Sequence, residues 1–405
     1  MVPEIRFNEF YDSWNNVTLG KVSKFSKGKG ISKSDIDSSG NLECIRYGEL
    51  YTHYGETISE IISRTNTPKK ELILSEINDV IIPASGESSI DIAKASCVKK
   101  EGVALGGDLN IIKSKIDGVF LSYYLNGKRK IEIAKLAQGN SVVHLYPKQL
   151  GLLQINVPTK PEQQKIASFL SLVDEKINKL KEKKELLEQY KKGVMQQLFS
   201  QEIRFKDENG EDFPDWEELQ LSEILYEHKT KNKENSITEV FSVAKHKGVI
   251  NQIEHLGRSY SAKDIGHYKV ILPGDVVYTK SPTSEFPFGI IKQNQTDRSG
   301  VVSPLYGVFT PDTEALGYIL HEYFLSPINT YNYLNPLVQK GAKNTMNINN
   351  DTFLNGAQIP LPVVEAEQRK IAEFISKLSS KIELLVSQIE QLETWKKGLL
   401  QQMFV

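Results

Sequence analysis

The chain has 405 residues, a hydrophobic fraction of 39%, a charged fraction of 25% and a formal net charge of −1. This length allows two hydrophobic cores, and the absence of a long apolar run and of a signal-peptide pattern predicts a cytoplasmic protein without a membrane span. Two cysteines, Cys44 and Cys97, are too few for a disulfide framework or a zinc site.

The first segment, residues 1–158, has the pattern of a β-rich globular domain. Short apolar runs alternate with clusters of Gly, Asn and Ser, which is typical of strands joined by turns. Strands are expected within 72–83, 102–113 and 141–145, and helix is expected within 118–137.

Residues 159–200 are expected to form one long helix. Thr159 and Glu162 have the spacing of a capping box at its start. Apolar residues then recur at alternating steps of four and three, which predicts a coiled-coil seam. The seam consists of Ile166, Leu170, Val173, Ile177, Leu180, Leu187, Val194 and Leu198, with Lys184 and Lys191 in its two gaps.

A second β-rich segment, residues 201–362, follows. It opens on Glu202-Ile203-Arg204-Phe205, which repeats Glu4-Ile5-Arg6-Phe7. The run 270–278 also matches 72–83, with Asp275 in the place of Asp79. Further strands are expected within 237–243, 288–292 and 301–309, and helix is expected within 314–339.

Residues 363–405 repeat the long helix. Glu367–Phe404 is identical to Glu162–Phe199 at 19 of 38 positions. Its seam is Ile371, Ile375, Leu378, Ile382, Leu385, Ile389, Leu392, Leu399 and Met403, with Lys396 in the gap. The chain is therefore interpreted as a cyclic repeat of two units, with its termini close together. We expect an α+β fold in which the two helices pack as an antiparallel coiled coil about a pseudo-two-fold axis. The alternative is that each helix packs onto its own globular segment.

Several catalytic motifs are incomplete. His321-Glu322 begins like a zinc-protease motif, but the second histidine is absent, and the glycine-containing run 27–34 lacks the glycine that a P-loop needs before Lys33. Asn335-Pro336-Leu337-Val338 departs at its third position from the Asn-Pro-Pro-aromatic motif of adenine methyltransferases. We therefore expect no catalytic, cofactor-binding or metal-binding residues in this chain.

Three recurring patterns carry a family resemblance. They are Lys-Lys-Gly-x-x-Gln-Gln-x-Phe at 191–199 and 396–404, Pro-x-x-x-Glu-Gln-x-Lys-Ile-Ala-x-Phe at 158–169 with a one-residue-longer copy at 362–374, and Phe213-Pro214-Asp215-Trp216 followed by Leu219 and Leu221. Of the last pattern the first half keeps Trp14, Val17 and Leu19. In this order the patterns resemble the specificity subunit of type I DNA restriction–modification enzymes, over essentially the whole chain.

The resemblance implies that each globular segment is a target recognition domain for one half of a split, asymmetric DNA sequence. It implies that the helices form the spacer and bind two methyltransferase subunits, which carry S-adenosylmethionine and the methylation of adenine. It leaves open whether two motor-nuclease subunits join them. The near-neutral net charge is compatible with local basic patches, or with a partner that supplies much of the phosphate contact.

DNA contact requires polar and basic side chains, or backbone N–H groups, on loops. In the first domain the candidates are Lys27, Lys29, Lys33, Ser85, Gly86, Ser88, Ser89, Lys128, Arg129, Lys130, Gln138, Gly139 and Asn140. In the second domain they are Lys245, His246, Lys247, Arg258, Lys280, Ser281, Thr283, Lys340, Gly341, Lys343, Asn344 and Thr345. An ordinary solvated loop is the alternative at each position.

Four large side chains lie off the helical seams, namely Tyr190, Phe199, Trp395 and Phe404. Such side chains favour contact with another surface, either the methyltransferase subunits or the globular segments themselves. The competing interpretations of the whole chain are a coiled-coil interaction scaffold that never touches DNA and a nuclease that works alone. Binding of duplex DNA by the chain together with its methyltransferase partner, with methyl donor present, distinguishes them.

Overall fold

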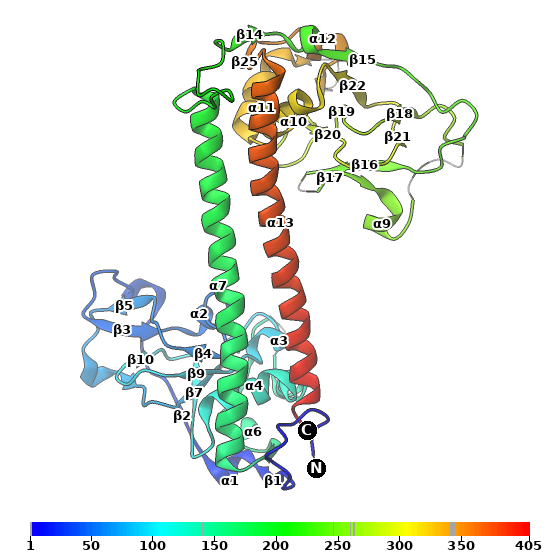
Figure 1. Cartoon of the computed structure of the whole chain (residues 1–405). Helices are drawn as coiled ribbons and strands as arrows, with labels where there is room; N and C mark the ends of the chain where they lie inside the picture. The colour runs from blue at the N-terminus through cyan, green and yellow to red at the C-terminus, as the bar shows by residue number, and fades with distance from the viewer. Residues whose placement is uncertain (1, 140, 246, 260, 262–263, 341–345) are drawn as a thin grey trace. The chain divides into compact units, whose positions relative to one another are not determined.

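The structure, a computed structural model, describes residues 2–139, 141–245, 247–259, 261, 264–340 and 346–405 (Figure 1). The chain divides into two compact units, and the division falls within both long helices, α7 (Lys160–Phe199) and α13 (Glu365–Gln402). The first unit extends to Glu185 and also contains Leu384–Val405, and the second is Leu186–Glu383. We call the part of each unit outside α7 and α13 its head.

The first head contains two main sheets. The larger has the order β2-β11-β7-β9-β4, and the smaller has the order β5-β3-β10-β6. The larger consists of β2 (Ser23–Lys27), β11 (Leu109–Ser114), β7 (Val80–Pro83), β9 (Ser96–Val98) and β4 (Thr57–Ile58). The smaller consists of β5 (Ser63–Thr65), β3 (Leu42–Ile45), β10 (Ala104–Leu105) and β6 (Ile73–Leu74). The helices of this head are α1 (Leu19–Val22), α2 (Tyr47–Thr52), α3 (Ser89–Ile92), α4 (Gly118–Gly127), α5 (Lys130–Leu136) and α6 (Pro147–Leu150), with 3-10 turns η1 (Lys33–Asp35) and η2 (Lys69–Glu71).

The second head is built on a sheet of order β15-β22-β19-β20. Its strands are β15 (Leu225–Glu227), β22 (Gly307–Pro311), β19 (Val276–Thr279) and β20 (Ile290–Gln293). Among the described residues it is accompanied by two-stranded sheets, which include β16 (Phe241–Ala244) with β17 (Gly248–Asn251), β18 (Lys269–Ile271) with β21 (Gly300–Val302), and β23 (Gln339–Lys340) with β24 (Met346–Asn347). The helices are α8 (Leu221–Ile224), α9 (Gln252–Leu256), α10 (Glu314–Tyr323), α11 (Pro327–Leu334) and α12 (Asn350–Leu354), with the 3-10 turn η3 (Asn335–Leu337).

The two heads follow one plan. In the first, β1 (Asn15–Thr18) pairs antiparallel with β13 (Gln154–Val157), directly before α7. In the second, β14 (Glu217–Leu219) pairs antiparallel with β25 (Ile359–Leu361), directly before α13. The match between 72–83 and 270–278 is also confirmed, because each run is strand, turn and strand. Asp79 accepts a hydrogen bond from the backbone N–H of Glu76, and Asp275 accepts the equivalent bond from Leu272.

The long helices run antiparallel. In the first unit, Ile166 and Leu170 near the start of α7 share a hydrophobic cluster with Leu399 and Met403 at the end of α13. In the second unit, Val194 and Leu198 at the end of α7 share a cluster with Ile371 and Ile375 at the start of α13. Because both clusters also contain head residues, each seam packs on the twin helix and on a head, so the two packing modes considered from the sequence occur together.

The cyclic repeat is visible in the backbone. The amide of Ile203 donates to the carbonyl of Gln197 on α7, and the amide of Ile5 donates to Gln402 on α13 at 3.1 Å. The arginines that follow bind equivalent buried carboxylates, since Arg6 pairs with Glu162 at 2.7 Å and Arg204 pairs with Glu367 at 3.2 Å. The segment around Ile5 therefore has the same position relative to α13 that the segment around Ile203 has relative to α7. It lies beside the end of α13, as expected.

Lysines in the seam gaps tie the helices to the heads. Lys396 binds Asp174 on α7 at 2.7 Å and Glu56 of the first head at 3.1 Å. Lys191 binds Glu322 of the second head at 2.7 Å and Ser379 on α13 at 2.8 Å. Removing one partner of a largely buried ion pair costs about 3–5 kcal/mol, because the other charge stays desolvated. These two lysines thus fix both the pairing of the helices and the seating of each head.

The described residues contain no helix that is long and apolar enough to cross a membrane. The same part of the chain contains no group of three or more His, Cys, Asp or Glu side chains that could hold a metal ion. Cys44 and Cys97 are free and buried.

Lys292, on β20 beside the Lys191–Glu322 pair, gives the second unit a pH-dependent stability. It is 1% exposed, and burial lowers its pKa to about 8, although Glu322 raises that pKa. The unfolded chain keeps the ordinary value of 10.5, so between pH 8 and 10.5 it binds more protons than the folded chain, and this lysine makes stability rise with pH. We expect Lys292→Met to stabilise the second unit at pH 7 by up to about 3 kcal/mol, with the gain shrinking as the pH rises through that window.

Urea unfolding of both proteins at pH 7, 8.5 and 9.5 measures this difference. Lys233→Met, at an exposed position of the same head, is the matched control and should show no pH-dependent gain. A constant difference between Lys292→Met and the unsubstituted protein across this range would show that the charge of Lys292 carries no cost.

Candidate nucleic-acid interface

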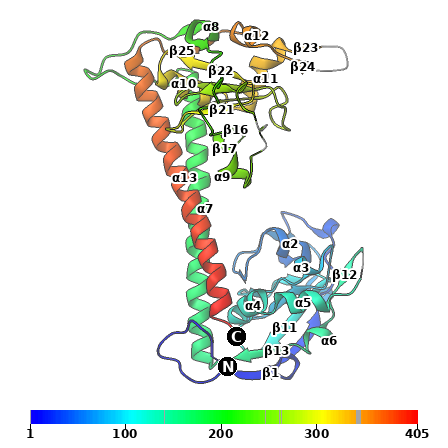
Figure 2. The same ribbon diagram turned by 90° about the vertical axis from the view of Figure 1, so that its right-hand side faces the viewer.

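Three segments that the sequence analysis singled out meet around Asn110 in the first head. Asn110 is buried, and its side-chain amide donates to the carbonyls of Leu145 at 2.9 Å and Pro83 at 3.4 Å. Its ladder partner on the neighbouring strand is Lys27. The buried amide thus joins the end of β7 to the segment after β12 (Val143–His144), and the strand pairing of Asn110 with Lys27 places the end of β2 at the same end of the sheet, near β12 in Figure 2.

A short two-stranded ribbon forms the surface at this end. In it β8 (Ser85–Gly86) pairs antiparallel with β12, and Gln138 forms a further bridge with His144. The hydroxyl of Tyr51 on α2 donates to the carbonyl of Ser85 at 2.9 Å. A Cβ at position 86 would lie 2.8 Å from that hydroxyl oxygen, so the tyrosine can approach because residue 86 is glycine.

Exposed basic and aromatic side chains gather beside the ribbon. The ammonium of Lys27 lies 5.5 Å from the centroid of the Tyr146 ring, and that ring stacks on His144 with centroids 6.3 Å apart. Lys27, His144 and Tyr146 are all exposed. This surface therefore offers a cation, an imidazole and aromatic faces to a ligand, which suits an anionic polymer with planar bases.

Other candidates of the first head make contacts that belong to the fold. Ser88 caps α3 by accepting from the amide of Asp91, and Ser89 is the first residue of that helix. Arg129 pairs with Glu132 at 2.6 Å, and its guanidinium lies over the Tyr124 ring at 5.7 Å. Of the remaining positions, Lys29 after β2, Lys33 in η1 and Gly139 are exposed. Lys128 and Lys130 lie at the junction of α4 and α5. Asn140 lies outside the described residues.

In the second head, the loop after β19 and the turn after β16 are joined. Lys245 binds Glu285 at 2.5 Å. Within the loop, Thr283 accepts a hydrogen bond from the amide of Phe286 at 3.2 Å. Lys280 and Ser281 begin this loop, as Ala84 and Ser85 begin the segment after β7. Of the other candidates, Lys247 is exposed 3.5 Å from His255, Arg258 is exposed and Lys340 ends β23, while His246, Gly341, Lys343, Asn344 and Thr345 lie outside the described residues.

The structure adds basic residues that the sequence analysis did not single out. Lys229 and Lys269 approach Glu227 at 3.6 and 3.8 Å, and Lys231 forms a backbone bridge with Lys269. Burial lowers the pKa of Lys269, and the nearby charges of Lys229 and Lys231 lower it further. Burial also lowers the pKa of Lys280, and the charge of Lys269 lowers it further. The ammonium groups of Lys229 and Lys269 therefore lie beside Glu227, and Lys231 and Lys280 interact electrostatically with Lys269. The alternating lysines 229, 231 and 233 were the available sequence signal.

The four off-seam aromatic side chains divide into two kinds. Phe404 is 1% exposed and packs 5.6 Å from both Phe120 and Tyr124, so it belongs to the core of the first head and is not available to a partner. Phe199 is half-buried and packs 5.1 Å from Tyr323. Packing on the head, the alternative considered from the sequence, therefore describes both phenylalanines. Tyr190 and Trp395 remain 54% and 48% exposed.

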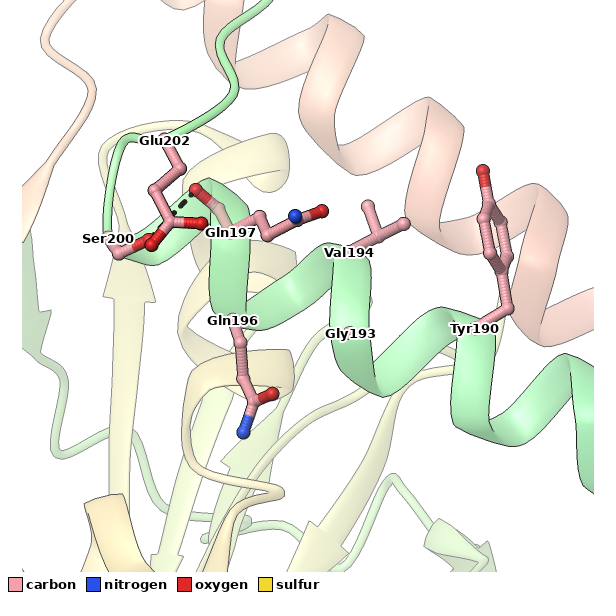
Figure 3. A pocket seen from close by; sticks show the side chains of 7 residues that line it. All are labelled: Tyr190, Gly193, Val194, Gln196, Gln197, Ser200 and Glu202. Atoms are coloured by element: carbon pink, nitrogen blue, oxygen red, sulfur yellow. Dashed lines mark hydrogen bonds between the residues drawn. The ribbon is translucent and has the colours of Figure 1, made fainter.

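A pocket of about 590 Å³ lies beside Tyr190 on the last turns of α7 (Figure 3). In Figure 3 the ring of Tyr190 stands away from the helix next to Val194, and Ser200 donates to the carbonyl of Gln197 at 3.2 Å. The pocket is lined by Tyr190, Gly193, Val194, Gln196, Gln197, Ser200 and Glu202. It is a shallow, open surface with mixed chemistry, and it fits a protein side chain better than an enclosed small molecule.

Comparison with known proteins points to one family. Residues 11–189 match the family model described as the type I restriction modification DNA specificity domain. Over 411 aligned residues, the chain is 26% identical to the type I restriction enzyme MjaVIII specificity subunit of Methanocaldococcus jannaschii, covering 96% of this chain and 91% of that protein.

Solved structures agree on the fold. The S subunit of a type I restriction–modification system from M. genitalium matches with a TM-score of 0.66 at 15% identity, over 100% of this chain and 99% of that one. A chain from a study of complex assembly and conformational transition of the type I R-M system matches with a TM-score of 0.50 at 15% identity, over 97% of each chain. The expected α+β fold with two long helices in contact is confirmed.

Asn110 should control the order of the ribbon in the first head. We expect Asn110→Ala to remove both hydrogen bonds and to leave two carbonyls poorly satisfied, at a cost of about 1–3 kcal/mol. Amide exchange at residues 84–86 and 143–146 should accelerate, with no change in the second head. Asn16→Ala, which removes the Asn16–Asn156 contact at the β1–β13 pair, is the matched control. Unchanged exchange at 143–146 in the Asn110 variant would show that the ribbon is held by other contacts.

Proposed function

Because the chain belongs to the specificity subunits of type I restriction–modification systems, the non-catalytic component of those enzymes, we propose that its two heads recognise the two halves of a split DNA sequence, one half per head. The observation that carries this proposal is a shared sheet with different surfaces at its end. The first head presents His144 and Tyr146 beside the β8–β12 ribbon, and the second presents the loop after β19, which Lys245 joins to the turn after β16 through Glu285.

The difference between the heads implies an asymmetric target. Two identical heads related by a two-fold axis would recognise a palindrome. Here the sheet order β15-β22-β19-β20 corresponds to β2-β11-β7-β9, whereas the loops that follow β7 and β19 differ in length and in contacts. Bases between the two half-sites would be passed over without contact, and the paired helices α7 and α13 would set that distance.

The helices are also the proposed docking surface for two methyltransferase subunits. Tyr190 and Trp395 occupy the same position of the repeated helix, and both are exposed. Two matched aromatic side chains, one in each unit, suit two copies of one partner. Those partners would hold S-adenosylmethionine and would turn the target adenine out of the duplex to methylate it. Two motor-nuclease subunits would join in the restriction form of the complex.

The lysine cluster around Glu227 weighs against a scaffold that never binds nucleic acid. Lys229 and Lys269 flank Glu227 and Lys231 lies beside Lys269, so positive charge exceeds negative charge at this surface, which favours an anionic ligand. We therefore retain DNA recognition as the proposed function.

An exchange of heads tests the split target. Replacing residues 20–150 with the matching region of a related specificity subunit should change one half of the methylated sequence and leave the other half and the spacing unchanged. Methylome sequencing of cells that express the system measures both halves at once. The reciprocal exchange within the second head, over residues 222–355, should change only the other half. If either exchange alters both halves, the heads are not separate readers.

Trp395 tests the docking surface. Trp395→Ala should weaken retention of the methyltransferase subunit by about tenfold or more, as expected for an exposed aromatic anchor, without lowering helicity. Phe404→Ala should instead destabilise the first unit by about 3–5 kcal/mol, because it empties a core position. Lys397→Ala, exposed two residues further on, is the control for partner retention. Full retention of the partner by Trp395→Ala, measured by co-purification, would remove this residue from the interface.

A further inference from the structure

The ladder register aligns two lysine pairs, and it does so at the same spacing that relates Trp14 to Trp216 and Leu19 to Leu221. In the first head Val80 faces Ile112 across the sheet, and Ile112 faces Phe25 on β2. In the second head Val276 faces Phe309, and Phe309 faces Glu227 on β15. Val80 and Val276 each follow the aspartate that makes the shared turn, so Phe25 and Glu227 hold equivalent places.

Two residues beyond these positions come Lys27 and Lys229, and two further on come Lys29 and Lys231. The positions between them differ, with Gly28 in one head and Thr230 in the other. The two heads thus keep lysines at both alternate positions while the intervening residue changes. A lysine pair that persists where its neighbours vary serves something that both heads share.

Both pairs continue the edge strand toward the second sheet of their head. The amide of Lys29 donates to the carbonyl of Leu105 on β10 at 2.9 Å. Lys231 forms its backbone bridge with Lys269 on β18. The backbone of each pair is therefore anchored, while all four side chains are exposed, that of Lys229 to 76%.

The chemistry of the four positions fits a phosphate better than a base edge. A lysine ammonium is a compact point charge on a flexible stem, and it binds phosphate without the fixed bidentate geometry that base readout favours. In the second head Lys269, whose backbone forms a bridge with Lys231, is a further lysine beside the pair. If the pairs read bases, two heads with different targets would not need the same residues at the same places.

We infer that Lys27 with Lys29, and Lys229 with Lys231, bind the phosphate backbone of duplex DNA at the two half-sites as a sequence-independent contact common to both heads. This inference rests on the proposed function. Phosphate contacts fix the position and orientation of a protein on DNA without specifying sequence. The loops that differ between the heads then select bases against a backbone that both heads hold in the same way.

The test uses the full chain assembled with its methyltransferase subunits. Its affinity is measured by fluorescence anisotropy over a series of salt concentrations. Two duplexes are compared, one carrying the methylated sequence identified by methylome sequencing and one with that sequence scrambled. Each double variant, Lys27→Ala with Lys29→Ala or Lys229→Ala with Lys231→Ala, should weaken binding to both duplexes by the same factor. The slope of log affinity against log salt should become shallower by about 0.9 for each phosphate that the variant no longer binds, or roughly 2 for each pair.

Two controls keep the result specific. Lys27→Arg with Lys29→Arg retains the charge and should retain the slope. Lys24→Ala removes an exposed lysine of the same strand whose counterpart in the second head is Tyr226, and it should leave the slope unchanged. Unchanged slopes in the alanine double variants, or weaker binding confined to the target duplex, would overturn the assignment to phosphate. Failure of the unsubstituted complex to bind either duplex would instead overturn the proposed function, before any variant is compared.

Discussion

The structure depends on the burial of one apolar stripe along each long helix. The two helices have 40 and 38 residues and mostly polar surfaces. Neither would be stable in water with its apolar stripe exposed. In each unit the cover comes from the twin helix on one side and from the core of a head on the other. Each stripe is covered jointly by the twin helix and by a head. A change in the pairing of the helices or in the position of a head would therefore expose part of the stripe to water.

The polar residues within the seam restrict this packing to one register. Lys191 and Lys396 replace apolar residues in the seam, and each is largely buried with carboxylate or hydroxyl partners from the opposite helix and a head. A slip of one helix along the other would leave these ammonium groups buried and unpaired. Buried ionic groups of this kind add little net stability, but they penalise alternative arrangements, as polar residues in coiled-coil seams do.

The periodic parts of the fold could be predicted from the sequence, and the parts set by strand pairing could not. The seams, the cyclic repeat and the matching runs at 72–83 and 270–278 are local patterns of apolar residues, so they can be read along one chain. The strands of the smaller sheet, such as Leu42–Ile45 and Ser63–Thr65, are short and show no clear alternation. Helix is present within 118–137, but it is interrupted after Gly127.

The candidate sites show the same division. The ladder register equates Lys27 with Lys229, as does their spacing from Leu19 and Leu221, but few residues near them are shared between the heads, so Lys229 was not singled out from the sequence. The burial of Phe404 depends on Phe120 and Tyr124, which are distant in sequence and give no local signal. Convergence around Asn110 likewise joins three segments that lie far apart along the chain. Candidates picked residue by residue from polar loops could not anticipate these contacts.

The core of the first head includes Leu399, Met403 and Phe404, which follow the whole of the second unit in the chain. The second unit, by contrast, is continuous in sequence from Leu186 to Glu383. On the ribosome the later unit therefore possesses all its residues first, which reverses the usual N-terminal-first order of domain folding. Until residues 399–404 have been synthesised, the first head keeps part of its apolar surface uncovered.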